Sequence, residues 1–155
     1  MEDILNATLA GGVAIGAPAG IITNPAASLA IGLIVGSVST IGFVKLTPKL
    51  QEFLGLNDTC GINNLHGIPG LLGGIFSAIV IAAYNTSIID KQYEAYLPFN
   101  QTASGRTYSQ QAGYQIAGTG ASLGMGLLFG FIAGMVIACV YKFQEKQFFT
   151  DRVYF

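Results

Sequence analysis

The chain's only histidine, His66, lies in the segment Asp58–Gly70, which reads Asp-Thr-Cys-Gly-Ile-Asn-Asn-Leu-His-Gly-Ile-Pro-Gly. Residues 59–89 around it contain no aspartate, glutamate, lysine or arginine. An ionisable group is costly to place in lipid, and where one occurs it commonly marks a path for substrate or protons. A neutral imidazole can hold a small polar molecule or relay a proton. The pattern favours a transport pathway over the alternative, a histidine that only hydrogen-bonds two helices.

The composition predicts an all-α, multi-pass integral membrane protein. Of the 155 residues, 10% are charged and 52% hydrophobic, whereas a typical soluble domain is roughly 25% charged. The net charge of −1 gives no basic surface, so no nucleic acid is expected as a partner. Two cysteines and one histidine match no metal or redox spacing, so no metal or cofactor is expected. An enzyme is not expected either, because no nucleophile–base pair is present.

About four transmembrane helices are expected in a helix bundle, because spanning the hydrocarbon core takes roughly 20 apolar residues. Residues 4–44 and 107–141 carry no Asp, Glu, Lys or Arg at all. The predicted spans cover residues 2–17, 26–46, 60–83 and 113–141, and residues 142–155 form a tail. The first span is the shortest. Glycines recur at four-residue spacing, as in Gly32/Gly36 and Gly70/Gly74, which predicts helices that approach closely.

The distribution of lysine and arginine predicts the orientation. The loop between the second and third spans and the tail carry five such residues: Lys45, Lys49, Lys142, Lys146 and Arg152. The loop between the third and fourth spans carries only Lys91 and Arg106. The positive-inside rule therefore places the C-terminus in the cytoplasm. The opposite loop contains the glycosylation sequons of Asn85 and Asn100, which agrees with an external position at the plasma membrane.

Asp58 begins the third span and sets the depth of His66. If this segment is helical, the imidazole lies roughly 12 Å along it from Asp58, near the middle of a core about 30 Å thick. An aspartate at a helix start is also a good N-cap and favours the helix dipole. We therefore expect Asp58 to cap and support the histidine span rather than to contact a substrate directly.

The neighbours of His66 on an α-helical face are small or polar. Residues three and four positions away, Asn63, Pro69 and Gly70, share that face. Pro69 has no N–H, so in an α-helix the carbonyl of Leu65 loses its partner. A free carbonyl beside an imidazole is a polar site in an apolar span and needs a partner. These residues are predicted to support a pore around His66.

Three segments resemble one known family. Asp58–Gly70 resembles the histidine-bearing span of the Rh glycoproteins, the animal branch of the ammonium transporter superfamily. The opening Asn6–Ala14 is similar to the start of an earlier Rh span, and Ser39–Val44 with Leu46-Thr47-Pro48 is similar to the end of the next one. The matches lie in order across residues 6–74. The fourth span resembles the family mainly in hydropathy and glycine content.

The resemblance implies a C-terminal portion of an eleven-span ammonium-transporter fold, which forms trimers with a pore in each subunit. In that family two histidines, one from each half of an inverted repeat, lie in the pore, and ammonia crosses after ammonium gives up a proton. His66 matches the second histidine and Asp58 the aspartate at the start of its span. The other half of the repeat is absent, and the pore lies between the halves. This chain alone is therefore not expected to conduct, and it is expected to be a fragment.

Two other functions remain open at this level. One is a non-transporting Rh-like membrane scaffold subunit, a branch that lacks the pore histidines; the presence of His66 favours transport instead. The other is a small proton-coupled channel built from several four-span copies. Within the leading hypothesis the partners are ammonium or ammonia, the lipid bilayer, and further Rh subunits in a homotrimer or hetero-oligomer.

Overall fold

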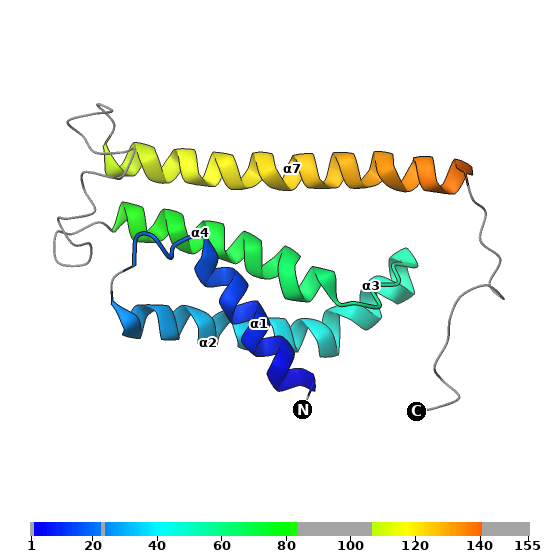
Figure 1. The fold of residues 1–155 in the computed structure, drawn as a ribbon, viewed down its shortest axis with the longest axis horizontal. Coiled ribbons are helices and arrows are strands. Elements are labelled where there is room, and N and C mark those ends of the chain that lie inside the picture. Colours follow the sequence, from blue (N-terminus) through cyan, green and yellow to red (C-terminus); the bar gives the residue numbers. More distant parts are fainter. Residues whose placement is uncertain (1, 23, 84–106, 141–155) are drawn as a thin grey trace. The chain divides into compact units, whose positions relative to one another are not determined.

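The computed structural model describes residues 2–22, 24–83 and 107–140, and every element in these ranges is a helix (Figure 1). The elements are α1 (Glu2–Gly16), α2 (Pro25–Ile41), η1 (Gly42–Leu46), α3 (Thr47–Leu54), η2 (Asn63–Gly67), α4 (Ile68–Ala82) and α7 (Tyr108–Val140). The two η elements are π-helical turns. The predicted all-α class is confirmed. The sequons of Asn85 and Asn100 and the tail 142–155 lie outside the described residues.

Three helices in the described ranges are long and apolar enough to cross a membrane: Pro25–Leu54, Asn63–Ala82 and Tyr108–Val140. They correspond to the second, third and fourth predicted spans. The first predicted span also forms a helix, α1, but its 15 residues rise only about 22 Å, short of a core about 30 Å thick. Large apolar side chains such as Leu33 (75% exposed) and Leu127 (67%) point outward from the spanning helices, as lipid-facing residues do.

The second spanning helix extends past its predicted end at residue 46. It continues through η1 and α3 to Leu54. Pro48 does not stop it, because Pro48 lies in the first turn of α3, directly after the π turn η1, where proline is tolerated. The helix ends at Gly55, whose φ of 64° is left-handed and whose N–H donates to the Gln51 carbonyl at 3.1 Å.

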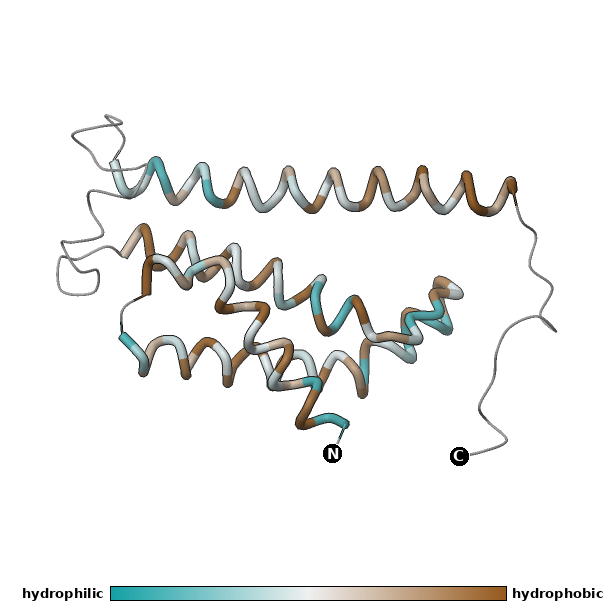
Figure 2. The backbone as a smooth tube through the Cα atoms, in the orientation of Figure 1, coloured by the Kyte–Doolittle hydropathy of each residue, from teal (hydrophilic) through white to brown (hydrophobic). Residues whose placement is uncertain are grey.

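Helix α7 begins earlier than the predicted residue 113, at Tyr108. The hydroxyl of Thr107 accepts from the N–H of Gln110 at 3.2 Å, and the Gln110 side chain accepts from the N–H of Thr107 at 3.0 Å. This reciprocal pair is a capping box, and Thr-x-x-Gln is its sequence signal. Figure 2 shows α7 becoming more apolar from this end toward its C-terminal end.

The chain forms two compact units, Met1–Gly120 and Ala121–Phe155. Within the first, α1 crosses α2 and α4 and contacts both (Figure 1). Backbones approach closely at glycines, which join Gly11 to Gly32, Gly36 to Ala7 and Gly73 to Ala14. In lipid, where apolar surface gives little drive for association, such small-residue contacts hold helices together. Four-residue spacing predicts only part of this pattern, since Gly12 and Gly70 face open space.

Gly36→Ala should loosen the contact between α1 and α2. A Cβ at Gly36 would lie 2.8 Å from the Ala7 carbonyl oxygen, and overpacking of this kind costs about 1–3 kcal/mol. Gly12→Ala is the matched control, because a Cβ there meets nothing within 4 Å and alanine favours a helix by up to about 1 kcal/mol. Thermal unfolding in detergent, followed by circular dichroism, should show a lower midpoint for Gly36→Ala only. Equal midpoints would contradict this packing.

Candidate functional site

His66 lies in the π-helical turn η2, not in an α-helical turn as predicted. The N–H of Ile68 donates to the carbonyl of Asn63, five residues earlier, which defines the wider register. Such turns are rare and are frequently found at functional sites. The α-helical face assumed from the sequence is therefore changed, because spacings of three and four residues no longer place side chains one above another in this turn.

The wider register also changes which carbonyl Pro69 leaves without a backbone donor. Five residues before Pro69 is Asn64, whereas the α-helical register pointed to Leu65. The neighbouring N–H of Ile68 is already directed to Asn63, so the turn offers Asn64 no donor. The hydroxyl of Ser39, from α2, donates to the Asn64 carbonyl at 2.9 Å in a buried position. The structure therefore shows an interhelical hydrogen bond at the Asn64 carbonyl, while a role of the Leu65 carbonyl in a pore remains a prediction.

Asp58 caps the start of the histidine turn. Its two carboxylate oxygens accept from the N–H groups of Ile62 at 2.9 Å and Asn63 at 2.8 Å. Gly61, with φ of 66°, turns the chain between them. A carboxylate at this position satisfies donors that a helix start leaves free, and it complements the helix dipole. The geometry is that of the capping role expected for Asp58, while a place beside a pore remains a prediction.

The residues predicted to line or support a pore differ in how far they are buried. Pro69 is fully buried, and Asn63 and Leu65 are partly buried. His66 and Gly70 are exposed, and a Cβ at Gly70 would meet nothing within 4 Å. Among the described residues, none forms a hydrogen bond with the imidazole. The described helices therefore leave the side chain of His66 exposed.

Asn64 is the polar residue that sequence reasoning missed. Its side chain is 0% exposed, and its Nδ2 donates to the hydroxyl of Thr47 at 2.6 Å. Its Oδ1 accepts from Nδ2 of Asn63 at 3.3 Å. The sequence shows two adjacent asparagines, and only the fold separates the buried one from its partly buried neighbour. We refer to Ser39, Thr47 and Asn64 with their hydrogen bonds as the amide clasp.

A second π-helical turn, η1, faces this site from the preceding span. Gly42, its first residue, lies against the amide of Asn64, where a Cβ would be 2.5 Å from Oδ1. The ring of Phe43 lies over Gly61, where a Cβ would collide with it. Each π turn has a proline six residues after its first residue, Pro48 and Pro69. That repeated spacing was the available sequence signal for the paired turns.

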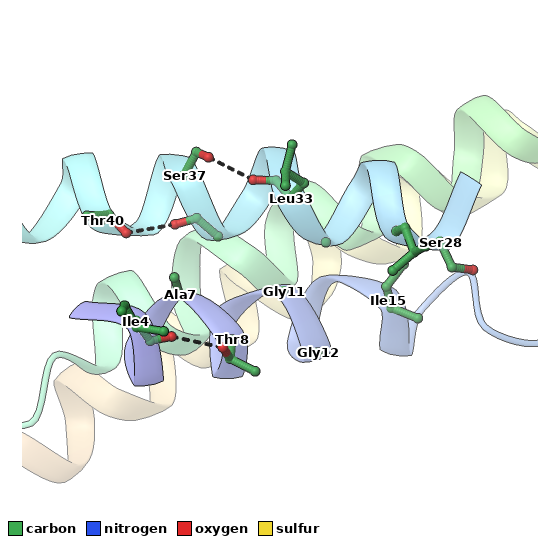
Figure 3. A pocket seen from close by; sticks show the side chains of 13 residues that line it. Ile4, Ala7, Thr8, Gly11, Gly12, Ile15, Ser28, Leu33, Ser37 and Thr40 are labelled. Carbon is green, nitrogen blue, oxygen red and sulfur yellow. Dashed lines mark hydrogen bonds between the residues drawn. The ribbon is translucent and has the colours of Figure 1, made fainter. Parts of the chain in front are cut away.

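The described residues form one hollow beside the Asp58 cap and one groove between two helices. A hollow of about 400 Å³ lies beside the cap, lined by Thr47, Leu50, Leu56, Asn57, Asp58, Ile62 and Asn63. A groove of about 620 Å³ runs between α1 and α2 (Figure 3). The hydroxyls of Thr8, Ser37 and Thr40 in this groove each donate to a carbonyl four residues earlier. The groove is therefore an apolar surface with little polar chemistry to offer.

Residues 1–148 match the Ammonium Transporter Family. The chain belongs to this family. It is 42% identical over 158 residues to the ammonium transporter Rh type C of Canis lupus familiaris, covering 99% of this chain and 34% of that protein. The Xenopus laevis and Homo sapiens proteins of the same name are 42% and 41% identical, each over 99% of this chain and 33% of their own length. This chain therefore spans about a third of these relatives.

These similarities confirm the resemblance to the Rh branch, across nearly the whole chain rather than residues 6–74 alone. With three helices suited to span a membrane among the described residues and this family membership, the chain is an integral membrane protein. Membership of a transporter family also confirms the expectation that it is not an enzyme.

Asp58→Ala should weaken the start of the histidine turn. It removes the acceptor of two N–H groups, a loss worth about 1 kcal/mol at a helix cap. Asn57→Ala is the control, because Asn57 is an exposed neighbour in the same loop. Amide hydrogen exchange of the chain in detergent should be faster at residues 62 and 63 in Asp58→Ala only. Unchanged protection at both residues would show that the cap does not hold the turn.

Proposed function

We propose that this chain supplies the His66 side of an ammonia-conducting pathway in an Rh-type ammonium transport protein. One observation carries the proposal: the imidazole lies in a membrane-spanning helix, exposed, with no hydrogen bond to any described residue. A polar ring left open in lipid is costly, so a partner is needed. Two partners would complete the hydrogen bonds of the imidazole. One is a second pore histidine, which the family resemblance implies and this chain lacks, and the other is a passing ammonia molecule.

The chemistry of imidazole fits a small neutral amine. Its unprotonated nitrogen accepts from an N–H of ammonia, and its N–H donates to the lone pair of ammonia. A charged ammonium ion is disfavoured in the apolar surroundings of a spanning helix, so the ion transfers a proton to water outside the apolar span and the nitrogen passes as ammonia. Gly67 and Gly70 are both exposed near His66, and their missing side chains leave room for a small solute beside the ring.

The remaining parts of the pathway are proposed to come from outside this chain, which spans about a third of its relatives. The open side of His66 is where a second half of the pore would lie. We propose further that the complete assembly is a homotrimer, or a hetero-oligomer with other Rh subunits. An Rh-like scaffold that does not transport is the alternative outcome of the tests below, and the presence of His66 supports transport.

His66→Ala should slow transport in a fusion in which this chain replaces the matching third of the dog relative. Losing a hydrogen-bonding partner worth about 1.5 kcal/mol slows passage about tenfold. Ile79→Ala is the control, because Ile79 is an exposed apolar residue on the same helix. Uptake of labelled methylammonium, divided by the amount of fusion at the cell surface, measures the effect. Unchanged uptake in His66→Ala would overturn the pore assignment, and no uptake in the unmodified fusion would favour the scaffold.

The proposed topology places the C-terminus in the cytoplasm and the loop with both sequons outside the plasma membrane. The excess of lysine and arginine in the tail and in the loop between the second and third spans supports it. In animal cells, the Asn85→Gln and Asn100→Gln double variant should then migrate faster on a gel than the unmodified chain. Glycosidase treatment should remove this difference. Equal mobility, together with a C-terminal tag that antibody reaches on intact cells, would reverse the orientation.

A further inference from the structure

Every polar group of Asn64 has a partner, which is unusual for a side chain in an apolar span. The N–H donates to the Gly61 carbonyl at 3.0 Å, and the carbonyl accepts from Ser39. The amide donates to Thr47 and accepts from Asn63. A buried polar group without partners is costly because its lost hydration is not replaced, so removing one partner destabilises this arrangement. The side chain is therefore held in one position rather than tolerated in several.

The amide clasp reaches across the second span on both sides of its π turn. Ser39 lies just before η1 and Thr47 just after it. Gly42 lies between them and has no side chain to keep the amide of Asn64 away. The clasp therefore fixes the histidine turn against the preceding span through side chains that are 25 and 17 residues away in sequence.

The register of this turn decides where the imidazole points. His66 is two residues after Asn64 in the same turn. A π turn carries one residue more than an α-helical turn, and each residue of an α-helix turns the chain by about 100°. A return to the α-helical register would therefore rotate one side of the turn against the other by about that angle. It would also move the Asn64 carbonyl away from its position opposite Pro69. In the present register that carbonyl accepts a hydrogen bond from the Ser39 hydroxyl.

We infer that Asn64, held by Ser39 and Thr47, is a positioning residue that keeps the His66 turn in its π register and aims the imidazole into the transport pathway. This inference rests on the proposed function for its transport consequence. Its structural part, the dependence of the ring's surroundings on the clasp, stands without it. The two parts are tested separately.

The first test uses the fact that His66 is the only histidine. Selective ¹⁵N-histidine labelling of the full chain in lipid nanodiscs gives signals from one imidazole. Thr47→Val and Ser39→Ala each remove one hydroxyl of the clasp and should shift or broaden these signals. Thr40→Val and Ser37→Ala are matched controls, because those hydroxyls bond only within α2. Thr47→Ser keeps a hydroxyl and should restore the original signals. Unchanged signals in both clasp variants would overturn the inference.

The second test asks whether the clasp acts through His66. In the dog fusion, Thr47→Val should lower methylammonium uptake per surface molecule about fivefold, close to the 1 kcal/mol typical of a hydrogen bond. The same change in a His66→Ala background should cause no further loss, because the imidazole that it positions is gone. Losses that multiply would show a purely structural role and overturn the positioning assignment. If His66→Ala alone changes nothing, the pore proposal fails, while the nitrogen signals still decide the structural part.

Discussion

The missing N–H of Pro69 is the constraint on which the site depends. In the π register it leaves the carbonyl of Asn64 without a backbone donor, and a spanning helix offers no water to replace it. The hydroxyl of Ser39 supplies the donor from another helix. A local defect in one helix is therefore corrected only when two spans are packed together. The geometry of the histidine turn therefore includes a hydrogen bond from the preceding span.

That packing has to be close, and the sequence achieves it with glycines rather than with bulky apolar side chains. At Gly42 the amide of Asn64 occupies space that any Cβ would fill, and at Gly61 the ring of Phe43 does the same. Helices in lipid gain little from burying apolar surface, so short approaches and hydrogen bonds between helices carry more of the association. The glycines allow the two spans to approach closely enough for the hydrogen bonds of the amide clasp to form. Those hydrogen bonds in turn hold the two spans at this short distance.

The sequence predicted those features that charge and hydropathy determine. Charge-free blocks located the spanning helices, and the single histidine located the candidate site. The sequence did not predict the π register, and the partners that Asn64 has in it, Ser39 and Thr47, lie 25 and 17 residues away. Choosing Leu65 instead of Asn64 as the carbonyl freed by Pro69 follows from the same cause. The second helix extends beyond the predicted residue 46, because Pro48 lies in the first turn of α3, where proline is tolerated.

Two polar side chains, two residues apart, have opposite surroundings. Asn64 is fully buried and each of its polar atoms has a hydrogen-bond partner within the described chain, whereas His66 is exposed and has none there. Satisfied buried networks make a structure rigid and specify one arrangement. An imidazole on such a support has a fixed backbone beneath it and ring nitrogens that are free to form hydrogen bonds, which are two properties required to receive a small solute. The cost of leaving it open in a membrane is offset only when further protein or the solute itself completes its hydrogen bonds. This division between closed and open polar groups is the physical reason for regarding the described site as one side of a larger one.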